Sequence, residues 1–175
     1  MKKYFAAGVL LILFSCSNTD QKDATTATDS TQTEVADTAA TVQLKDAQLQ
    51  SIYDGYISLK NSLVETNYDE SKTAAAGLQT SLAAYKGCEQ TATVASKIAG
   101  AKDIVEQRKQ FTQLSADLIA VLKQADLNSG AIYVQRCPMA NNGDGGEWLS
   151  SQKKIQNPYY GDEMMECGAV LQEIN

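Results

Sequence analysis

The sequence predicts a mainly α-helical domain: a three- or four-helix up-and-down bundle with a C-terminal irregular or β-hairpin segment packed on it. Two observations support this prediction. Apolar residues recur at steps of three and four between Leu44 and Leu122, which is the period of one helix face. No proline occurs before Pro138, and the glycine-rich stretch 143–146 and both prolines come late in the chain, as expected where helices give way to turns.

The first 15 residues are typical of a signal peptide. Two lysines precede an apolar run over residues 4–14, which is shorter than the roughly 20 residues that span a bilayer. The following Leu-Phe-Ser-Cys ends at Cys16 and resembles the lipobox of bacterial lipoproteins. That resemblance implies cleavage before Cys16 and a lipid on its sulfur, with two or three acyl chains as a durable anchor. An ordinary signal peptide with a chance cysteine is the alternative.

Residues 16–41 are expected to form a disordered tether, because they are mostly Ser, Thr, Asp, Gln and Ala, with Val35 as the one sizeable apolar side chain. Loss of Lys2 and Lys3 would change the formal net charge from −6 to −8. An acidic chain gives no electrostatic reason to bind nucleic acid or anionic lipid. We therefore expect one folded domain over residues 42–175, lipid-anchored in the cell envelope and facing the periplasm or the cell exterior.

Three helical regions are predicted, over residues 43–64, from a cap at Asn67 to Gly87, and over residues 91–124. Gly100 and Asp103 divide the third into a short and a long helix. Arg108 falls on or beside the apolar stripe of the long helix. Either its charged end reaches the surface, or it pairs with a carboxylate or with carbonyl groups of the C-terminal segment. We favour the second, since a buried charge needs a partner.

The C-terminal segment is expected to begin with a short strand at 131–136, which Pro138 ends. Trp148 and Leu149 are expected to anchor the segment in the core, and Asn157-Pro158 and Gly161 to form turns. Residues 167–174 can return as a strand beside 133–136 or form a short helix. If they return as a strand, two sulfur-containing clusters meet.

These two clusters are the candidate site. Cys137 lies two residues before Met139, and Met164 and Met165 precede Cys167. In extended backbone Cys137 and Met139 would share a face, and either helical or extended backbone would bring one methionine beside Cys167. Thiolate and thioether sulfurs select Cu(I), and the chain has no histidine. We therefore expect a Cu(I) site, with Ag(I) as a second possible cargo.

Each of these residues has an alternative role. Methionines commonly fill gaps in a core, and at most one of Met164 and Met165 is expected to face the site. Cys137 and Cys167 could instead form a structural disulfide in an oxidising compartment. With Cys16 lipidated, three cysteines remain, and Cys88 is expected to be the unpaired, buried one.

The C-terminal motifs resemble a bacterial domain family of unknown function. These motifs are C-P-M-A at 137–140, G-x-W-L at 146–149 and I-x-N-P-Y-Y-G-x-x-M-x-x-C-G at 155–168. Residues 103–115 also look like the family's central helix, with the pattern D-I-V-E-Q-R-x-x-F-x-x-L-S. The family occurs as stand-alone lipoproteins and as an extension of membrane-fusion subunits of copper/silver efflux systems. The resemblance implies heavy-metal handling through Cys137, Met139, Met164 and Cys167. Ala140 stands where the related C-P-M-H motif has histidine.

Residues for other chemistry are missing. Without histidine there is no Ser-His-Asp triad, and no phosphate-binding glycine motif occurs. We expect a non-enzymatic protein without an organic cofactor that binds Cu(I) or Ag(I) and buffers it or passes it to an efflux membrane-fusion subunit or a copper acceptor. The alternative is a structural or interaction lipoprotein with a Cys137–Cys167 disulfide.

Overall fold

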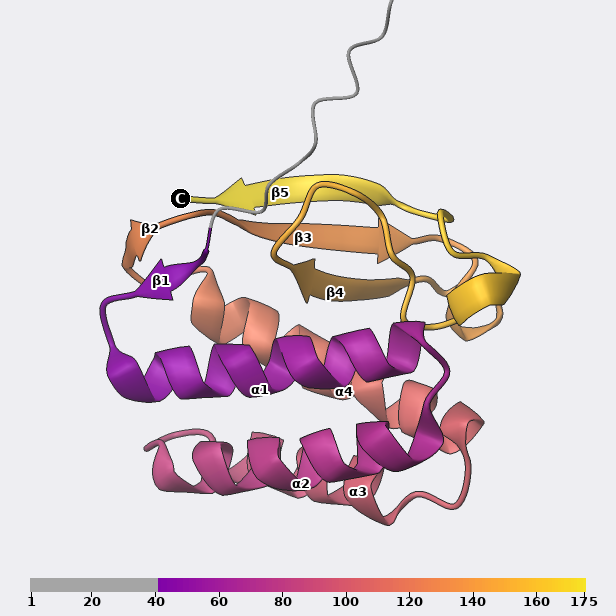
Figure 1. The fold of residues 1–175 in the computed structure, drawn as a ribbon, viewed down its shortest axis with the longest axis horizontal. Helices are drawn as coiled ribbons and strands as arrows, with labels where there is room; N and C mark the ends of the chain where they lie inside the picture. Colours follow the sequence, from indigo (N-terminus) through magenta and orange to yellow (C-terminus); the bar gives the residue numbers. More distant parts are fainter. Residues whose placement is uncertain (1–40) are drawn as a thin grey trace, which may run out of the picture. The chain divides into compact units, whose positions relative to one another are not determined.

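The computed structural model describes residues 41–175. The predicted signal peptide, the lipidation site Cys16 and nearly all of the predicted tether lie outside the described residues. The described part is mainly helical, with four α-helices and a C-terminal antiparallel strand segment (Figure 1). No helix within residues 41–175 is long and apolar enough to cross a membrane.

The helices are α1 (Ala47–Val64), α2 (Tyr68–Ala84), α3 (Glu89–Gly100) and α4 (Ile104–Leu122), and each packs against the next. Side chains cap three of them. The Asn67 side chain accepts a hydrogen bond from the backbone N–H of Glu70, and the Asp103 side chain accepts one from Glu106. The cap at Asn67 was predicted and is confirmed. The break between α3 and α4 also falls where Gly100 and Asp103 predicted it.

The first helix begins later than predicted. Gln43–Leu44 is a short strand, β1, that pairs antiparallel with β2 (Leu127–Ser129). Asp46 then caps α1 by accepting from two backbone N–H groups. The prediction of helix from residue 43 is wrong because these residues find their hydrogen-bond partners more than 80 residues away along the chain. Residues 127–129 supply those partners.

A three-stranded sheet follows, with β3 (Ile132–Cys137) between β4 (Gly146–Ser150) and β5 (Ala169–Ile174), all antiparallel. Val134 lies opposite Leu149 on one side and Gln172 on the other. Of the two alternatives left open for residues 167–174, a strand beside β3 or a short helix, the structure has the strand. The connections contain two short 3₁₀ turns, η1 (Asn141–Gly143) and η2 (Gly161–Glu163).

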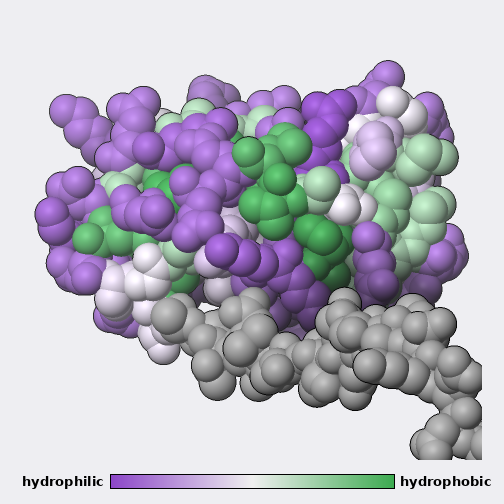
Figure 2. Space-filling model, turned by 90° about the horizontal axis from the view of Figure 1, so that it is seen from above, coloured by the Kyte–Doolittle hydropathy of each residue, from purple (hydrophilic) through white to green (hydrophobic). Residues whose placement is uncertain are grey.

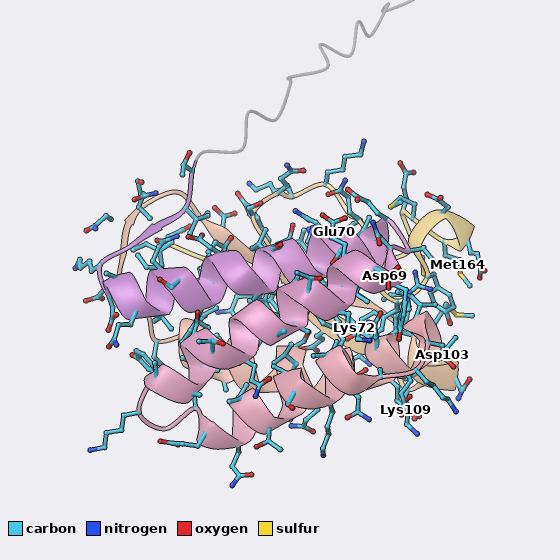
Figure 3. All side chains as sticks on the ribbon, turned by 60° about the horizontal axis from the view of Figure 1, so that its bottom comes forward. Asp69, Glu70, Lys72, Asp103, Lys109 and Met164 are labelled. Carbon is cyan, nitrogen blue, oxygen red and sulfur yellow. The ribbon has the colours of Figure 1, made fainter. Side chains whose placement is uncertain are left out.

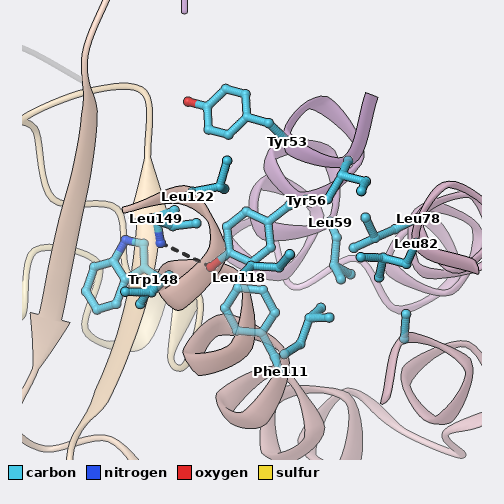
Figure 4. Close-up of a cluster of buried hydrophobic side chains, with 14 of the residues drawn as sticks. Tyr53, Tyr56, Leu59, Leu78, Leu82, Phe111, Leu118, Leu122, Trp148 and Leu149 are labelled. Atoms are coloured by element: carbon cyan, nitrogen blue, oxygen red, sulfur yellow. Dashed lines mark hydrogen bonds between the residues drawn. The ribbon is translucent and has the colours of Figure 1, made fainter. Parts of the chain in front are cut away.

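Aromatic side chains join the sheet to the helices (Figure 4). Tyr56 stacks on Phe111 with ring centroids 5.4 Å apart. The Tyr56 hydroxyl accepts from the backbone N–H of Leu149 at 3.1 Å and shares a hydrogen bond of 2.8 Å with Ser115. Trp148 is fully buried, and its ring N–H donates to Gln135 Oε1 at 2.8 Å. Trp148 and Leu149 therefore anchor β4 in the core, and the sheet has a fixed position on α1 and α4.

The strand β5 lies at an edge of the sheet and remains largely exposed. Figure 2, which views the structure from the side of β5, shows apolar surface among hydrophilic side chains. Val170 and Leu171 are exposed on this strand, while Ile174 near its end is buried. The sheet therefore buries side chains mainly through β3 and β4.

Candidate metal-binding dithiol

The two cysteines of the C-terminal segment meet. The sulfurs of Cys137 and Cys167 are 2.9 Å apart, although 30 positions separate the two residues in the sequence. Both are free thiols. Cys137 ends β3 and is fully buried, whereas Cys167 is half-buried just before β5. The pair therefore has one protected sulfur and one that is partly accessible.

Sheet pairing and a turn place Cys167. Arg136 lies opposite Ala169, so the start of β5 is held beside the end of β3. The Asn157 side-chain amide donates to the carbonyl of Cys167 at 3.1 Å. Gly168 has a φ of +152°, and a Cβ there would lie 2.8 Å from the Arg136 carbonyl oxygen and 3.0 Å from the Trp148 ring. Only glycine fits this approach, and it lets Cys167 reach Cys137.

The predicted methionine faces are wrong. β3 ends at Cys137 and residues 138–140 form a turn, so Met139 leaves the strand and is 54% exposed while Cys137 is buried. Residues 164–167 are neither helix nor strand, so neither spacing argument for Cys167 applies. Met164 is 36% exposed and lies at the periphery of the structure, toward the end where α4 begins (Figure 3). Met165 instead lines a groove with Lys60.

Within residues 41–175 no three or more His, Cys, Asp and Glu side chains form a cluster that could hold a metal ion. Metal binding near Cys137 and Cys167 would therefore use the two thiols with any thioether that reaches them. Thiolates are soft ligands that suit Cu(I). A disulfide, with a sulfur–sulfur bond of about 2.05 Å, would need only a small further approach of the two atoms.

The shared hydrogen bond with Cys137 raises the pKa of the Cys167 thiol, and burial raises it further, while the backbone N–H of Met139 acts in the opposite direction. Cys167 is therefore protonated at neutral pH. A metal that binds Cys167 as a thiolate must release this proton, so binding through this residue is stronger at higher pH.

Arg108 ties the helices to the chain that leads to Cys167. Its Nε donates to the Pro158 carbonyl at 2.9 Å, and its terminal nitrogen donates to the Leu63 carbonyl at 3.0 Å and to Thr66 Oγ1 at 2.9 Å. Of the two roles considered for Arg108, the contacts match pairing with carbonyl groups, including one of the C-terminal segment. No carboxylate takes part in these three bonds.

Gly161 permits the close approach of this segment to α1. Its φ is +58°, and a Cβ would lie 2.5 Å from Thr66 Oγ1 and 2.7 Å from the Val64 carbonyl oxygen. Asn157 shapes the preceding turn, because its side-chain oxygen accepts from the N–H of Tyr159 at 2.9 Å. These residues place the segment; none of them contacts the two sulfurs through a hydrogen bond.

Two further positioning residues were not predicted from the sequence. The Gln135 side-chain amide lies within 2.7–3.3 Å of three successive carbonyl oxygens, from Gln152 to Lys154. The Tyr160 hydroxyl donates to the Met139 carbonyl at 2.7 Å and so holds the turn after Cys137. A glutamine in a strand gives no sequence signal for such a role.

Residues 52–130 match the model of a family described as "Protein of unknown function (DUF3347)". The chain is thus similar to a domain of unknown function over the helices and β2, and the match ends before β3, Cys137 and Cys167. No curated protein matches the chain. No solved structure matches it either.

Proposed function

We propose that this chain binds one Cu(I) or Ag(I) ion through Cys137 and Cys167 and buffers the ion or passes it on. The observation that carries the proposal is the convergence of the two thiols, 2.9 Å apart, from the ends of two neighbouring strands. The partly exposed Cys167 would be the point of entry and exit. The metal is cargo, and the proposal includes no catalytic step and no organic cofactor.

A methionine would supply a third, exchangeable ligand. Met139 follows Cys137 by two residues and Met164 precedes Cys167 by three, and both side chains are exposed. Methionine has three rotatable side-chain bonds and reaches over an irregular surface. A thioether also binds without losing a proton. Met165 is the alternative to Met164, although its side chain lines a different groove.

The proposal places the protein in the cell envelope, with a lipid on Cys16, a flexible tether, and a helical bundle that carries the dithiol away from the membrane. The partner would be a membrane-fusion subunit of a heavy-metal efflux system or a copper acceptor protein. This context rests on the N-terminal motif and on the resemblance of the C-terminal motifs.

A second candidate function is supported by the same distance. If Cys137 and Cys167 are oxidised, the protein is an interaction lipoprotein whose last strand is fixed by a disulfide. The exposure of Met139 and Met164 favours this second candidate, because a sulfur-rich metal site would gather the methionines as well.

The two candidates differ in a Cu(I) titration of the reduced, full-length protein against a chromophoric chelator. All samples carry Cys16→Ser, and Cys137→Ser and Cys167→Ser are compared with Cys88→Ala, which removes a buried thiol elsewhere. We expect one tight equivalent that both serine variants lose and Cys88→Ala keeps, with an apparent affinity that rises with pH.

Equal binding in the serine variants, or none above the chelator, would contradict the copper proposal. Peptide mapping of the unreduced protein would then test the second candidate, which requires a Cys137–Cys167 linkage.

A further inference from the structure

Lys60 is a buried lysine without a counter-charge. It lies in the C-terminal half of α1 and is 2% exposed. Among the described residues, the ion pairs join Lys45 to Asp126, Arg136 to Glu147 and Lys153 to Glu173. Lys60 takes part in none of them, and no described side chain or carbonyl accepts a hydrogen bond from it. Lysine is rarely buried unless it is paired.

A groove of about 330 Å³ adjoins this lysine. The chain between β4 and η2 returns to the C-terminal end of α1 (Figure 1) and forms the opposite wall. Asn61, Ser151, Gln152 and Gln156 give the groove polar side chains. The remaining lining residues are Val64, Glu65 and Met165. The volume lies within the range of small-molecule sites.

The unpaired ammonium of Lys60 destabilises the folded protein. Burial lowers the pKa of Lys60 to about 8, since the charged form loses its water without gaining a partner. At neutral pH most molecules still carry the charge. An anion that entered the groove would pair with the ammonium and remove this penalty.

We propose that this groove binds a small organic carboxylate, with the Lys60 ammonium on the carboxylate and the amide and hydroxyl side chains of Asn61, Ser151 and Gln156 around its remaining polar groups. Val64 and Met165 would contact its carbon atoms. Glu65 also lines the groove, and its negative charge opposes an anion with two charges. Of the residues that line the groove, only Lys60 is basic, so its charge is matched by a ligand with a single negative charge. This inference is independent of the proposed copper site.

The test uses the reduced, full-length protein labelled with ¹⁵N, with lactate as the probe, sulfate as the divalent comparison and chloride as the ionic-strength control. We expect saturable shifts of the Ser151 and Gln152 amide signals with lactate in the wild type. Lys60→Met should weaken lactate binding at least tenfold, and Glu65→Gln should strengthen it because the opposing charge is gone. Lys86→Met removes an exposed lysine in the turn between α2 and α3 and should leave binding unchanged.

Shifts that match those in chloride, or equal lactate affinity in the wild type and Lys60→Met, would overturn the proposal. Tighter binding of sulfate than of lactate would overturn the assignment to a singly charged ligand. Lys60→Met replaces the side chain by an apolar one of similar length, so the fold should persist. If it does not, the opposite effect expected of Glu65→Gln still decides the question.

Discussion

Replacement of Lys60 by methionine should make the protein more stable. The folded state holds this lysine at a pKa of about 8, against an ordinary value of 10.5. At about 1.4 kcal/mol per unit of pKa difference, the charged Lys60 lowers the free energy of unfolding by about 3 kcal/mol. The side chain is 2% exposed, although it adjoins the groove, so solvent screens only part of this effect.

The direction of the pH dependence of stability follows from proton binding to Lys60. Between pH 8 and 10.5 the unfolded chain binds the proton on Lys60 more strongly than the folded chain does, so stability rises with pH through this window. Below pH 8 the penalty is fully present. Lys60→Met should therefore exceed the wild type by about 3 kcal/mol at pH 7, and the gap should shrink as the pH approaches 10.

Urea unfolding followed by circular dichroism, on reduced protein at pH 7 and pH 10, measures this gap. Lys86→Met is the matched control, because it removes a lysine that is already exposed. A Lys60→Met protein that is no more stable than the wild type at pH 7 would refute the reasoning. So would a gap that stays constant up to pH 10.

Three further predictions concern the C-terminal segment. Oxidation of Cys137 and Cys167 to a disulfide closes a loop of 30 residues and should stabilise the protein by about 3–4 kcal/mol. The urea midpoints of oxidised and reduced samples measure this stabilisation. Equal midpoints would contradict the prediction. Tyr56→Phe should cost roughly 1–3 kcal/mol, because the Leu149 N–H loses its acceptor in the core; an unchanged thermal midpoint would show that another group replaces the hydroxyl. Gly161→Ala should destabilise the protein by roughly 1–3 kcal/mol, since alanine is strained at φ +58° and its Cβ would meet the Val64 carbonyl. Differential scanning calorimetry should show a lower melting temperature. An unchanged melting temperature would argue against a fixed turn at this position.

The helices were predictable because their signals are local. Asn67 and Asp103 are capping residues placed at the start of apolar repeats, and both caps form. β1 was not predictable, since its two residues become a strand only by pairing with Leu127 and Ser129. Nothing within such a short segment distinguishes a strand from the first turn of a helix.

For the candidate site, the meeting of Cys137 and Cys167 was expected only if residues 167–174 returned as a strand beside residues 133–136, and a short helix was the alternative. The positions of the methionines did not follow, because Pro138 starts a turn and rotates Met139 away from the strand face. The burial of Lys60 was equally hidden. Its neighbour Leu59 belongs to the apolar stripe of α1, but the wall that covers Lys60 comes from residues about 90 positions later.

The order of the cysteines along the chain has a consequence for biogenesis. Among the three cysteines of the described residues, Cys88 is made first, then Cys137, and Cys167 follows another 30 residues later. Until that point the thiol that lies beside Cys137 in the folded protein is missing, and a disulfide between Cys88 and Cys137 would hold the helices and β3 in a non-native arrangement. In an oxidising compartment, correct maturation would then depend on thiol–disulfide exchange, and removing Cys88 should raise the yield of correctly folded protein.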